Sequence, residues 1–485
     1  MQLLAGWAAQ EFPIDRPVEL HGQYYQRISR GIRDPLMAIA LALEQRDGSR
    51  THQAVMVSVD TVFVTRDFQD DVRLALRTTL PELDGAAVVL NATHTHSGPS
   101  WYAPFRWWSP AKRAMTPAEI RALMLKGVVS AIEAAWQSRR PSGVSSASAY
   151  ETTGFCRRVL YSNGEAEMYG KTSRADFVGI EAGADDEVRM LFTWNSESQL
   201  TGIVLNVACP AQVLEAQYVV SADFVGELRK HVHASFGAHV GVVVQISAAG
   251  DLSPRNLPVQ HVDEANYWQE SGLIALARRL GRAIESAAPA ASSRIDFAPI
   301  LRHGIQNILL PLRRVTSEDH ERACAQVKRL THGHQDTAAA SKAHFRQFLA
   351  DVAVREQQGS YGPFDDKGMD FVLLENQLAV ISRFEVQQRT VSYPVELHAI
   401  RVADSAFVFN PFELYVDFGH AIRARSPASK TFVVQLACDA GGYLPTNRAV
   451  DAGGYGALVI NGNVGPDGGT QLIEASLEEI ERLWR

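Results

Sequence analysis

Short apolar runs rich in β-branched residues recur along the chain, and each ends in a cluster of small and polar residues. Runs of this length and composition, bounded by Gly, Pro and Asn, are typical of buried strands. We predict six such strands, within residues 54–62, 86–96, 202–212, 240–254, 406–413 and 431–443.

Helical periodicity fills much of the sequence between these runs. At 116–136, Thr116 is placed as the N-cap, Pro117 as the first helical residue and Glu119 as the partner in a capping box. Segment 316–358 predicts two charged amphipathic helices around a polar break, which we interpret as a helical hairpin protruding from the core. The chain has no internal repeat or clear linker. The pattern therefore predicts a single α/β domain over residues 1–485, with mixed sheets and flanking helices.

Chemically capable side chains follow the predicted strands. Because loops at the carboxyl ends of strands in α/β proteins converge on one crevice, we expect these side chains to share a site. They are Asp60, His94, His96, Cys209, Gln212, Asp251, Ser253, Glu413 and Tyr443.

Composition narrows the class of protein. The chain has 485 residues, 46% of them hydrophobic, and a net charge of −7, which does not favour nucleic acid as a partner. The four cysteines are far apart and form no disulfide framework, and the N-terminus has no signal-peptide pattern. No apolar run reaches the roughly 18 residues of a membrane helix. We expect a cytoplasmic protein that acts on a small molecule.

His94 and His96 are the first candidate metal-binding residues. In an extended segment alternate residues point to the same side, so both imidazoles can face one cavity, and neutral imidazole is a common ligand for transition metals. His332 and His334 repeat the spacing between charged helices, with no apolar run before them, and are read as a solvated loop.

Three other motifs could carry chemistry. Ser253 before Pro254 could be a nucleophile, an oxyanion donor or a substrate contact, or could belong to a turn held by Asp251. Glu413 could be a metal ligand or a first-turn charge favoured by a helix dipole. Tyr443 and Tyr455 lie in glycine-rich loops that could present their phenols to a ligand.

Taken together, these motifs resemble the neutral/alkaline non-lysosomal ceramidase family. The pieces that carry the resemblance occur in one order over about 450 residues: "YYQRISRGIRDPLMAIALAL", "ATHTHSGP", "GDLSP", "NPFE…ARSP" and "GGYLPT…GGYGA". The resemblance implies a ceramidase-like catalytic domain and zinc-dependent amide hydrolysis, which in the family cleaves ceramide.

The resemblance also implies roles for individual residues. His94, Glu413 and Tyr443 match zinc ligands, and His96 matches an acid–base group beside the metal. Ser253 matches an essential serine, and Tyr455 matches a second active-site phenol. Arg157 matches an active-site arginine, although Arg158 could be the match instead.

One strand end departs from the family. Pro210 stands where the family has another histidine ligand, and proline has no side chain that binds metal. Cys209 and Gln212 are neighbours that could replace it. Because strand residues alternate in direction, we expect Cys209 to pack into the core rather than bind a metal.

Three functional hypotheses follow. The first is zinc-assisted hydrolysis of an amide-type bond in a small substrate, which need not be ceramide. The second is a metal-independent glycoside hydrolase or lyase, and the third is a ligand-binding protein without catalysis. Retention of His94, Glu413 and Tyr443 favours the first.

Overall fold

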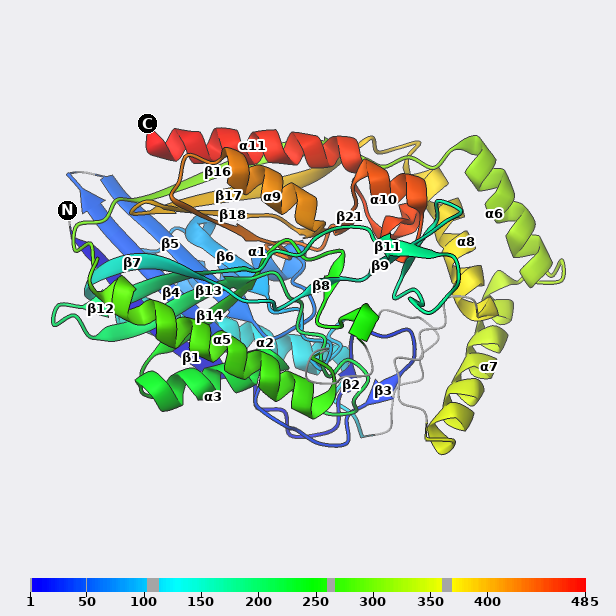
Figure 1. Ribbon diagram of the computed structural model, residues 1–485, viewed down its shortest axis with the longest axis horizontal. Coiled ribbons are helices and arrows are strands. Elements are labelled where there is room, and N and C mark those ends of the chain that lie inside the picture. Colours follow the sequence, from blue (N-terminus) through cyan, green and yellow to red (C-terminus); the bar gives the residue numbers. More distant parts are fainter. Residues whose placement is uncertain (1, 49, 103–112, 260–266, 360–368) are drawn as a thin grey trace.

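Two stacked sheets with helices on both outer sides form the body of the protein (Figure 1). The computed structural model describes residues 2–48, 50–102, 113–259, 267–359 and 369–485. The larger sheet has eight strands in the order β14-β13-β12-β7-β1-β4-β5-β6. Its strands are β1 (Leu3–Glu11), β4 (Met37–Asp47), β5 (Arg50–Val59), β6 (Val88–Ala92), β7 (Arg140–Tyr150), β12 (Glu187–Asn195), β13 (Leu200–Val207) and β14 (Gly241–Ile246).

The smaller sheet has four strands in the order β16-β17-β18-β20. They are β16 (Leu301–Pro311), β17 (Ser392–Val402), β18 (Ser405–Phe409) and β20 (Lys430–Val434). The pairs β5–β6, β13–β14 and β18–β20 are parallel, and the other neighbours in the two sheets are antiparallel. The predicted mixed α/β architecture is confirmed, and all six predicted strands form.

Apolar side chains from the facing strands fill the space between the sheets. Leu41, Met56 and Val243 of the larger sheet pack in one cluster with Ile400 and Phe407 of the smaller sheet. Because strands of both sheets contribute, this cluster fixes how the sheets stack, and hence where their ends meet.

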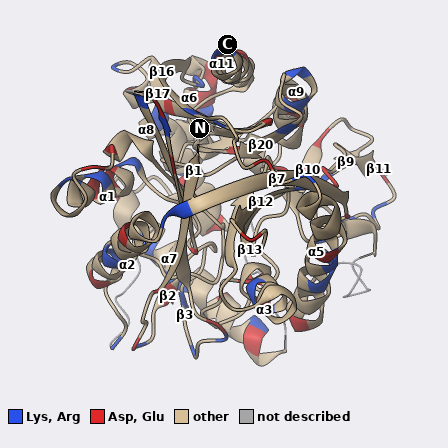
Figure 2. Ribbon diagram, turned by 90° about the vertical axis from the view of Figure 1, so that its left-hand side faces the viewer, with Lys and Arg blue, Asp and Glu red and all other residues tan. Residues whose placement is uncertain are grey.

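Helices cover the outer faces of both sheets (Figure 1). α1 (Arg66–Thr79) and α2 (Pro117–Gln137) pack against one half of the larger sheet, and α3 (Phe224–Phe236) and α5 (Gln269–Ser292) against the other. α9 (Val416–Arg425) and α11 (Pro466–Trp484) cover the smaller sheet. α2 begins with the predicted capping box of Thr116 and Glu119. The helices in the end-on view carry charges of both signs (Figure 2).

Segment 316–358 forms the two predicted helices, α6 (Ser317–Leu330) and α7 (Thr337–Gln357), and a third helix, α8 (Asp370–Val386), follows them. They lie together at one end of the molecule (Figure 1). Phe345 and Phe348 of α7 pack with Tyr25, and Arg383 of α8 hydrogen-bonds the carbonyl of Gly462. The helices therefore brace loops from both ends of the sequence.

The remaining short elements are mostly at the strand ends that face these helices. They are β2 (Glu19–Leu20), β3 (Arg27–Ile28), β8 (Phe155–Cys156), β9 (Arg158–Tyr161), β10 (Ala166–Met168), β11 (Phe177–Ile180), β15 (Leu252–Ser253), β19 (Phe412–Leu414), β21 (Gly442–Leu444), α10 (Asn447–Ala452), and the 3-10 turns η1 (Gly85–Ala87), η2 (Leu257–Val259), η3 (Tyr455–Ala457) and η4 (Val459–Asn461).

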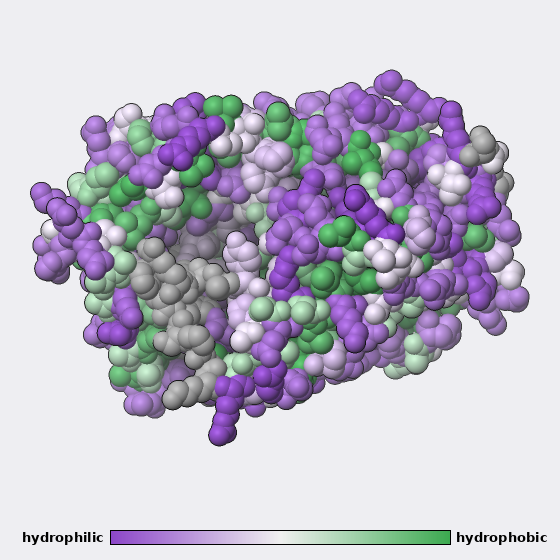
Figure 3. Space-filling model, turned by 180° about the vertical axis from the view of Figure 1, so that it is seen from behind, coloured by the Kyte–Doolittle hydropathy of each residue, from purple (hydrophilic) through white to green (hydrophobic). Residues whose placement is uncertain are grey.

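The surface is mixed in character. Hydrophilic and hydrophobic side chains are interspersed on the face shown in Figure 3. None of the helices within the described residues has the length and apolar character needed to cross a membrane. All four cysteines are unpaired, as expected from their spacing.

Phe407 tests the role of the core between the sheets. It is fully buried and stacks on Phe432 with ring centroids 4.2 Å apart. We expect Phe407→Ala to lower the free energy of unfolding by about 3–5 kcal/mol, because it removes apolar contacts and leaves a cavity. Urea denaturation measures this. Leu309→Ala, at a side chain that is 68% exposed, is the control and should cost at most about 0.5 kcal/mol. Equal effects of the two changes would contradict this account.

Candidate active site

A cavity of about 250 Å³ lies where strand ends of both sheets meet. Six of the seven residues that the sequence singles out as ligands or catalytic groups line it, and Ser253 does not. The lining residues are His21, Gly22, Gln23, Tyr24, Val62, Phe63, His94, His96, Arg157, Met168, Tyr169, Gln212, Glu215, Glu413, Tyr443 and Tyr455.

His94 and His96 follow β6 and face the cavity together. Their rings are 4.8 Å apart, and their Nε2 atoms are 3.3 Å apart. The backbone is not a regular extended segment here, since His94 has a φ of 62°, in the left-handed region. For a residue other than glycine this conformation is costly, and such residues cluster at functional sites. Burial lowers the pKa of both imidazoles, which are therefore neutral at pH 7.

Glu413 and Tyr443 are brought together by strand pairing. β19 and β21 are parallel, with Glu413 opposite Tyr443. The two side chains are hydrogen-bonded, and burial together with the Glu413 charge raises the pKa of Tyr443 well above its usual value. Glu413 Oε2 lies 3.7 Å from His94 Nε2. The three residues matched to zinc ligands therefore meet at one end of the cavity.

Tyr455 lies beside this group in η3. Its ring centroid is 5.9 Å from that of Tyr443 and 5.9 Å from that of Tyr24. The two residues before it, Gly453 and Gly454, have φ values of 74° and 88°, which glycine adopts readily. The glycine-rich loop thus presents a phenol to the cavity.

Arg157, and not Arg158, faces the cavity. Its Nη1 donates to Tyr169 Oη at 3.0 Å and to Gln212 Oε1 at 3.2 Å, and its Nη2 donates to Tyr443 Oη at 3.3 Å. Burial opposes the charge, but the surrounding phenols and Glu413 outweigh it, and the pKa of Arg157 lies well above its usual value. A permanent cation therefore lies next to the candidate ligands.

Arg158 does not line the cavity and has a structural role. It forms a buried ion pair with Glu181, in which Nη2 donates to Oε1 at 3.0 Å, and it also donates to the carbonyls of Ala449 and Gly453. Those carbonyls belong to the segment that leads into Tyr455. Of the two arginines that the sequence leaves open, Arg157 lines the cavity and Arg158 does not.

The segment around Pro210, which departs from the family pattern, is no longer a regular strand after Val207. Pro210 is buried and does not line the cavity, whereas Gln212 and Glu215 do. Gln212 Nε2 lies 2.8 Å from His96 Nε2, and Glu215 Oε2 lies 3.5 Å from His96 Nδ1. Cys209 is fully buried in the apolar cluster under α3 and α5. The thiol packs in the core, as expected, although Cys209 lies beyond the end of β13 and strand alternation does not place it there.

Sequence reasoning missed several cavity residues, among them Glu215 and His21. Glu215 lies five residues beyond the strand-end proline, and only the turn between them brings it back. His21 comes from the N-terminal loop, where burial lowers its pKa to about 4. Both are single polar residues in loops, and no spacing in the sequence marks them.

Ser253 lies outside the cavity, in β15, paired with Phe155. Its Oγ accepts a hydrogen bond from the Arg255 amide at 3.0 Å. Asp251 is also buried, and its Oδ1 accepts from the Val416 amide at 2.8 Å. The motif is thus a tight turn that ties the end of β14 to the start of α9.

The residues around His94 fit a zinc ion. His94 Nδ1 lies 2.7 Å from the carbonyl oxygen of Val62, so Nδ1 carries the proton and Nε2, 3.7 Å from Glu413 Oε2, carries the lone pair. Metal-bound histidines are oriented by such outer contacts. Imidazole nitrogen and carboxylate oxygen are ordinary zinc donors, and the phenol of Tyr443 adds a third once it ionises.

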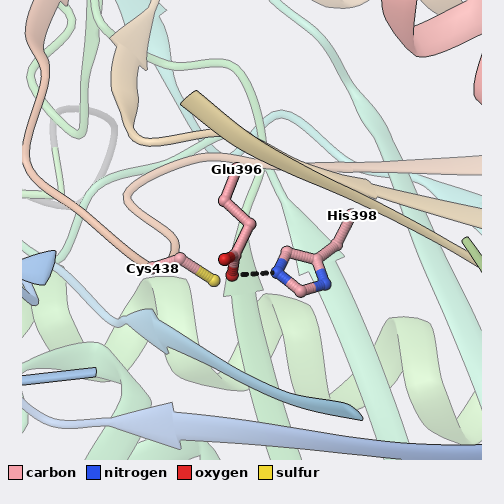
Figure 4. A group of neighbouring side chains, drawn as sticks. All are labelled: Glu396, His398 and Cys438. Carbon is pink, nitrogen blue, oxygen red and sulfur yellow. Dashed lines mark hydrogen bonds and ion pairs between the residues drawn. The ribbon is translucent and has the colours of Figure 1, made fainter. Parts of the chain in front are cut away.

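A second group of metal-ligand side chains lies away from the cavity (Figure 4). Donor atoms of Glu396, His398 and Cys438 lie within 4.8 Å of one another. Glu396 is already paired with Arg66 at 3.0 Å and with Arg73 at 2.7 Å. Two guanidinium groups beside the carboxylate oppose a divalent cation there, so we describe this candidate cluster as a charge network between α1 and β17.

Known proteins provide a comparison for this arrangement. No family model matches the chain. Neutral ceramidase of Pseudomonas aeruginosa is 24% identical over 291 residues, which are 56% of this chain and 41% of that protein. The chain thus matches less than half the length of this curated relative.

Solved structures match over the whole chain. One described as "Ceramidase complexed with C2" superposes with a TM-score of 0.69 and 15% identity, over 100% of this chain and 75% of the other. The crystal structure of neutral ceramidase from Pseudomonas aeruginosa gives a TM-score of 0.69 and 16% identity, over 100% and 74%. The chain has the fold of neutral ceramidase. In this neutral ceramidase fold the cavity described above lies at the strand ends, as the sequence predicts.

Breaking the Arg158–Glu181 pair should destabilise the fold. Arg158→Met leaves the Glu181 carboxylate buried without its partner, which should cost about 3–5 kcal/mol of unfolding free energy in urea denaturation. The double variant Arg158→Met/Glu181→Leu removes both charges and should recover much of that loss. A double variant less stable than the single one would contradict this interpretation.

Asp251 should make stability depend on pH. Burial raises its pKa from 3.8 to about 7, so between these values the folded protein binds a proton that the unfolded chain has lost. Its contribution to stability should therefore fall as pH rises from about 4 to about 7, by about 1.4 kcal/mol per pH unit. Urea unfolding of the native protein and Asp251→Asn across this range measures the difference. Parallel stability curves for the two proteins would refute the assignment.

Proposed function

We propose that the protein is a hydrolase that uses zinc to cleave an amide-type bond in a small substrate. The observation that carries the proposal is the meeting of His94, Glu413, Tyr443 and Arg157 at one cavity of a neutral ceramidase fold. A fold alone does not specify an activity, so the weight rests on these side chains.

The residues divide into two sets by their proposed role. His94, Glu413 and Tyr443 would hold the metal. A zinc ion there would supply Lewis-acid polarisation of the carbonyl and activation of the attacking water. Arg157 and Tyr455 line the cavity beside these ligands and would donate hydrogen bonds to the carbonyl oxygen as it gains charge. One well-placed donor of this kind lowers the activation free energy by about 3–4 kcal/mol.

Three further polar side chains line the cavity beside apolar ones such as Val62 and Phe63. Gln23, Gln212 and Glu215 offer amide and carboxylate groups to a bound molecule. This lining supports a substrate with hydrogen-bonding groups next to the scissile bond. Ser253 has no part in the proposed chemistry, because it does not line the cavity. The four unpaired cysteines support a cytoplasmic location.

A substrate panel tests the reaction class. We expect turnover of short N-acyl amides, with ceramide included in the panel, and no turnover of glycosides. A chelator should abolish the activity and added Zn²⁺ should restore it. Cleavage of glycosides that survives the chelator would instead establish the metal-independent alternative. If the protein cleaved neither amides nor glycosides but bound a small molecule tightly, it would be a non-catalytic binding protein.

Two variants test the metal ligands. His94→Ala should lose both zinc, measured by plasma mass spectrometry, and amide hydrolysis. Cys209→Ser is the control, because its thiol packs in the core, and it should retain both. If folded Cys209→Ser lost its zinc, the thiol would be the replacement ligand and our assignment would be wrong.

A further inference from the structure

The cavity contains a second imidazole, that of His96, beside the candidate ligand His94. The resemblance assigns a second histidine ligand to the position of Pro210, which cannot coordinate a metal. His96 is the nearest imidazole to His94, with 3.3 Å between their Nε2 atoms. The question is whether His96 Nε2 carries a proton or a lone pair.

The hydrogen bonds around Gln212 decide this. Arg157 Nη1 only donates, so the atom of the Gln212 amide that faces it, at 3.2 Å, is the oxygen. The Gln212 nitrogen therefore faces His96 Nε2, at 2.8 Å, and donates to it. His96 Nε2 is thus an acceptor, and the proton of the neutral ring is on Nδ1.

The other side of the ring agrees with this tautomer. His96 Nδ1 faces the Glu215 carboxylate at 3.5 Å, and a carboxylate only accepts. His94 has the same tautomer, because its Nδ1 donates to the Val62 carbonyl at 2.7 Å. Both Nε2 atoms therefore carry a lone pair and lie 3.3 Å apart with no proton between them, an arrangement that a cation stabilises.

The separation suits one metal ion. Two ligands on a tetrahedral zinc ion with bonds of 2.0–2.1 Å lie about 3.3–3.4 Å apart. The observed separation of the two Nε2 atoms is 3.3 Å, and Glu413 Oε2 lies 3.7 Å from His94 Nε2. We propose that His96 is a metal ligand in this protein and replaces the histidine lost at Pro210, so that His94, His96, Glu413 and Tyr443 form the set.

This inference rests on the zinc site of the proposed function and changes the role of His96 from proton transfer to coordination. Glu215 then orients His96 through Nδ1, as outer carboxylates orient metal-bound histidines. Gln212 holds the ring when no metal is bound and gives up its hydrogen bond to the lone pair when a metal binds.

The ring is held in place on two further sides. Gly22 has a φ of 101°, and a Cβ atom there would lie 2.5 Å from His96 Cγ and Nδ1. Arg27 Nη2 donates to the His96 carbonyl at 2.6 Å. Because ring and backbone are both confined, the Nε2 position is set before any metal arrives.

The test measures metal binding directly. In chelator-stripped protein, Zn²⁺ affinity is measured by competition with a chromophoric chelator, and Co²⁺ binding by its visible absorption spectrum. We expect His96→Ala to weaken Zn²⁺ binding more than about 100-fold, beyond the 10–100-fold typical of outer contacts, and to change the Co²⁺ spectrum. Glu215→Gln should weaken binding by about 10–100-fold. His21→Ala, at another buried imidazole of the same cavity, is the matched control and should change affinity less than about 3-fold.

The outcomes separate this inference from the proposed function. If His94→Ala abolishes zinc binding but His96→Ala changes neither affinity nor spectrum, His96 is not a ligand and the hydrolase proposal stands. If both histidines are needed for zinc but no amide is cleaved, the ligand set stands and the proposed function fails. Absence of any zinc binding overturns both. Should His96→Ala fail to fold, X-ray absorption of the zinc-loaded native protein counts the imidazoles: two support the inference, and one refutes it.

Discussion

A buried guanidinium group holds the active-site loops together. Arg27 is fully buried, and its Nη1 donates to the carbonyl of Gln217 at 2.8 Å, while its Nη2 donates to those of His21 and His96 at 2.6 Å. These carbonyls belong to three loops, each of which contributes residues to the cavity lining. Because an unsatisfied buried cation is costly, the three loops cannot separate without a large loss of free energy. The positions of the side chains on these loops depend on these three hydrogen bonds of Arg27.

Buried polar groups require the same order elsewhere in the cavity. Arg157 is buried among two phenols, an amide and the carbonyl of Gly250, to which its Nη2 donates at 2.9 Å. His94 and His96 are buried and neutral. In such a site each donor has few acceptors, so a single placed arginine determines the orientation of Gln212, and that orientation determines the tautomer of His96. The chemistry of the cavity is fixed by its hydrogen bonds as much as by its residue types.

Local patterns were enough to predict the elements and part of the site. The strands and the Thr116 capping box are set by neighbouring residues, and the chain adopts them as predicted. His94 and Glu413 were found because they end strands. Glu215 and His21 could not be found in this way, since they reach the cavity from loops whose paths depend on contacts such as those of Arg27. Ser253 shows the converse, because its motif is visible in the sequence while its hydroxyl is used within a turn.

Pro210, where the resemblance implies a histidine ligand, shapes the backbone around His96. The Pro210 carbonyl accepts a hydrogen bond from the backbone N–H of Gln212 at 2.8 Å, which closes a tight turn after β13. The Ala211 carbonyl then accepts from the His96 amide at 3.1 Å, so the turn is joined to the histidine loop. A regular strand would carry these residues away from the cavity. The turn instead brings Gln212 to Nε2 of His96 and Glu215 to Nδ1. In the proposed metal site, the histidine missing at Pro210 and the confinement of His96 are therefore linked through a few residues of backbone, and the turn at Pro210 rearranges that proposed site around His96.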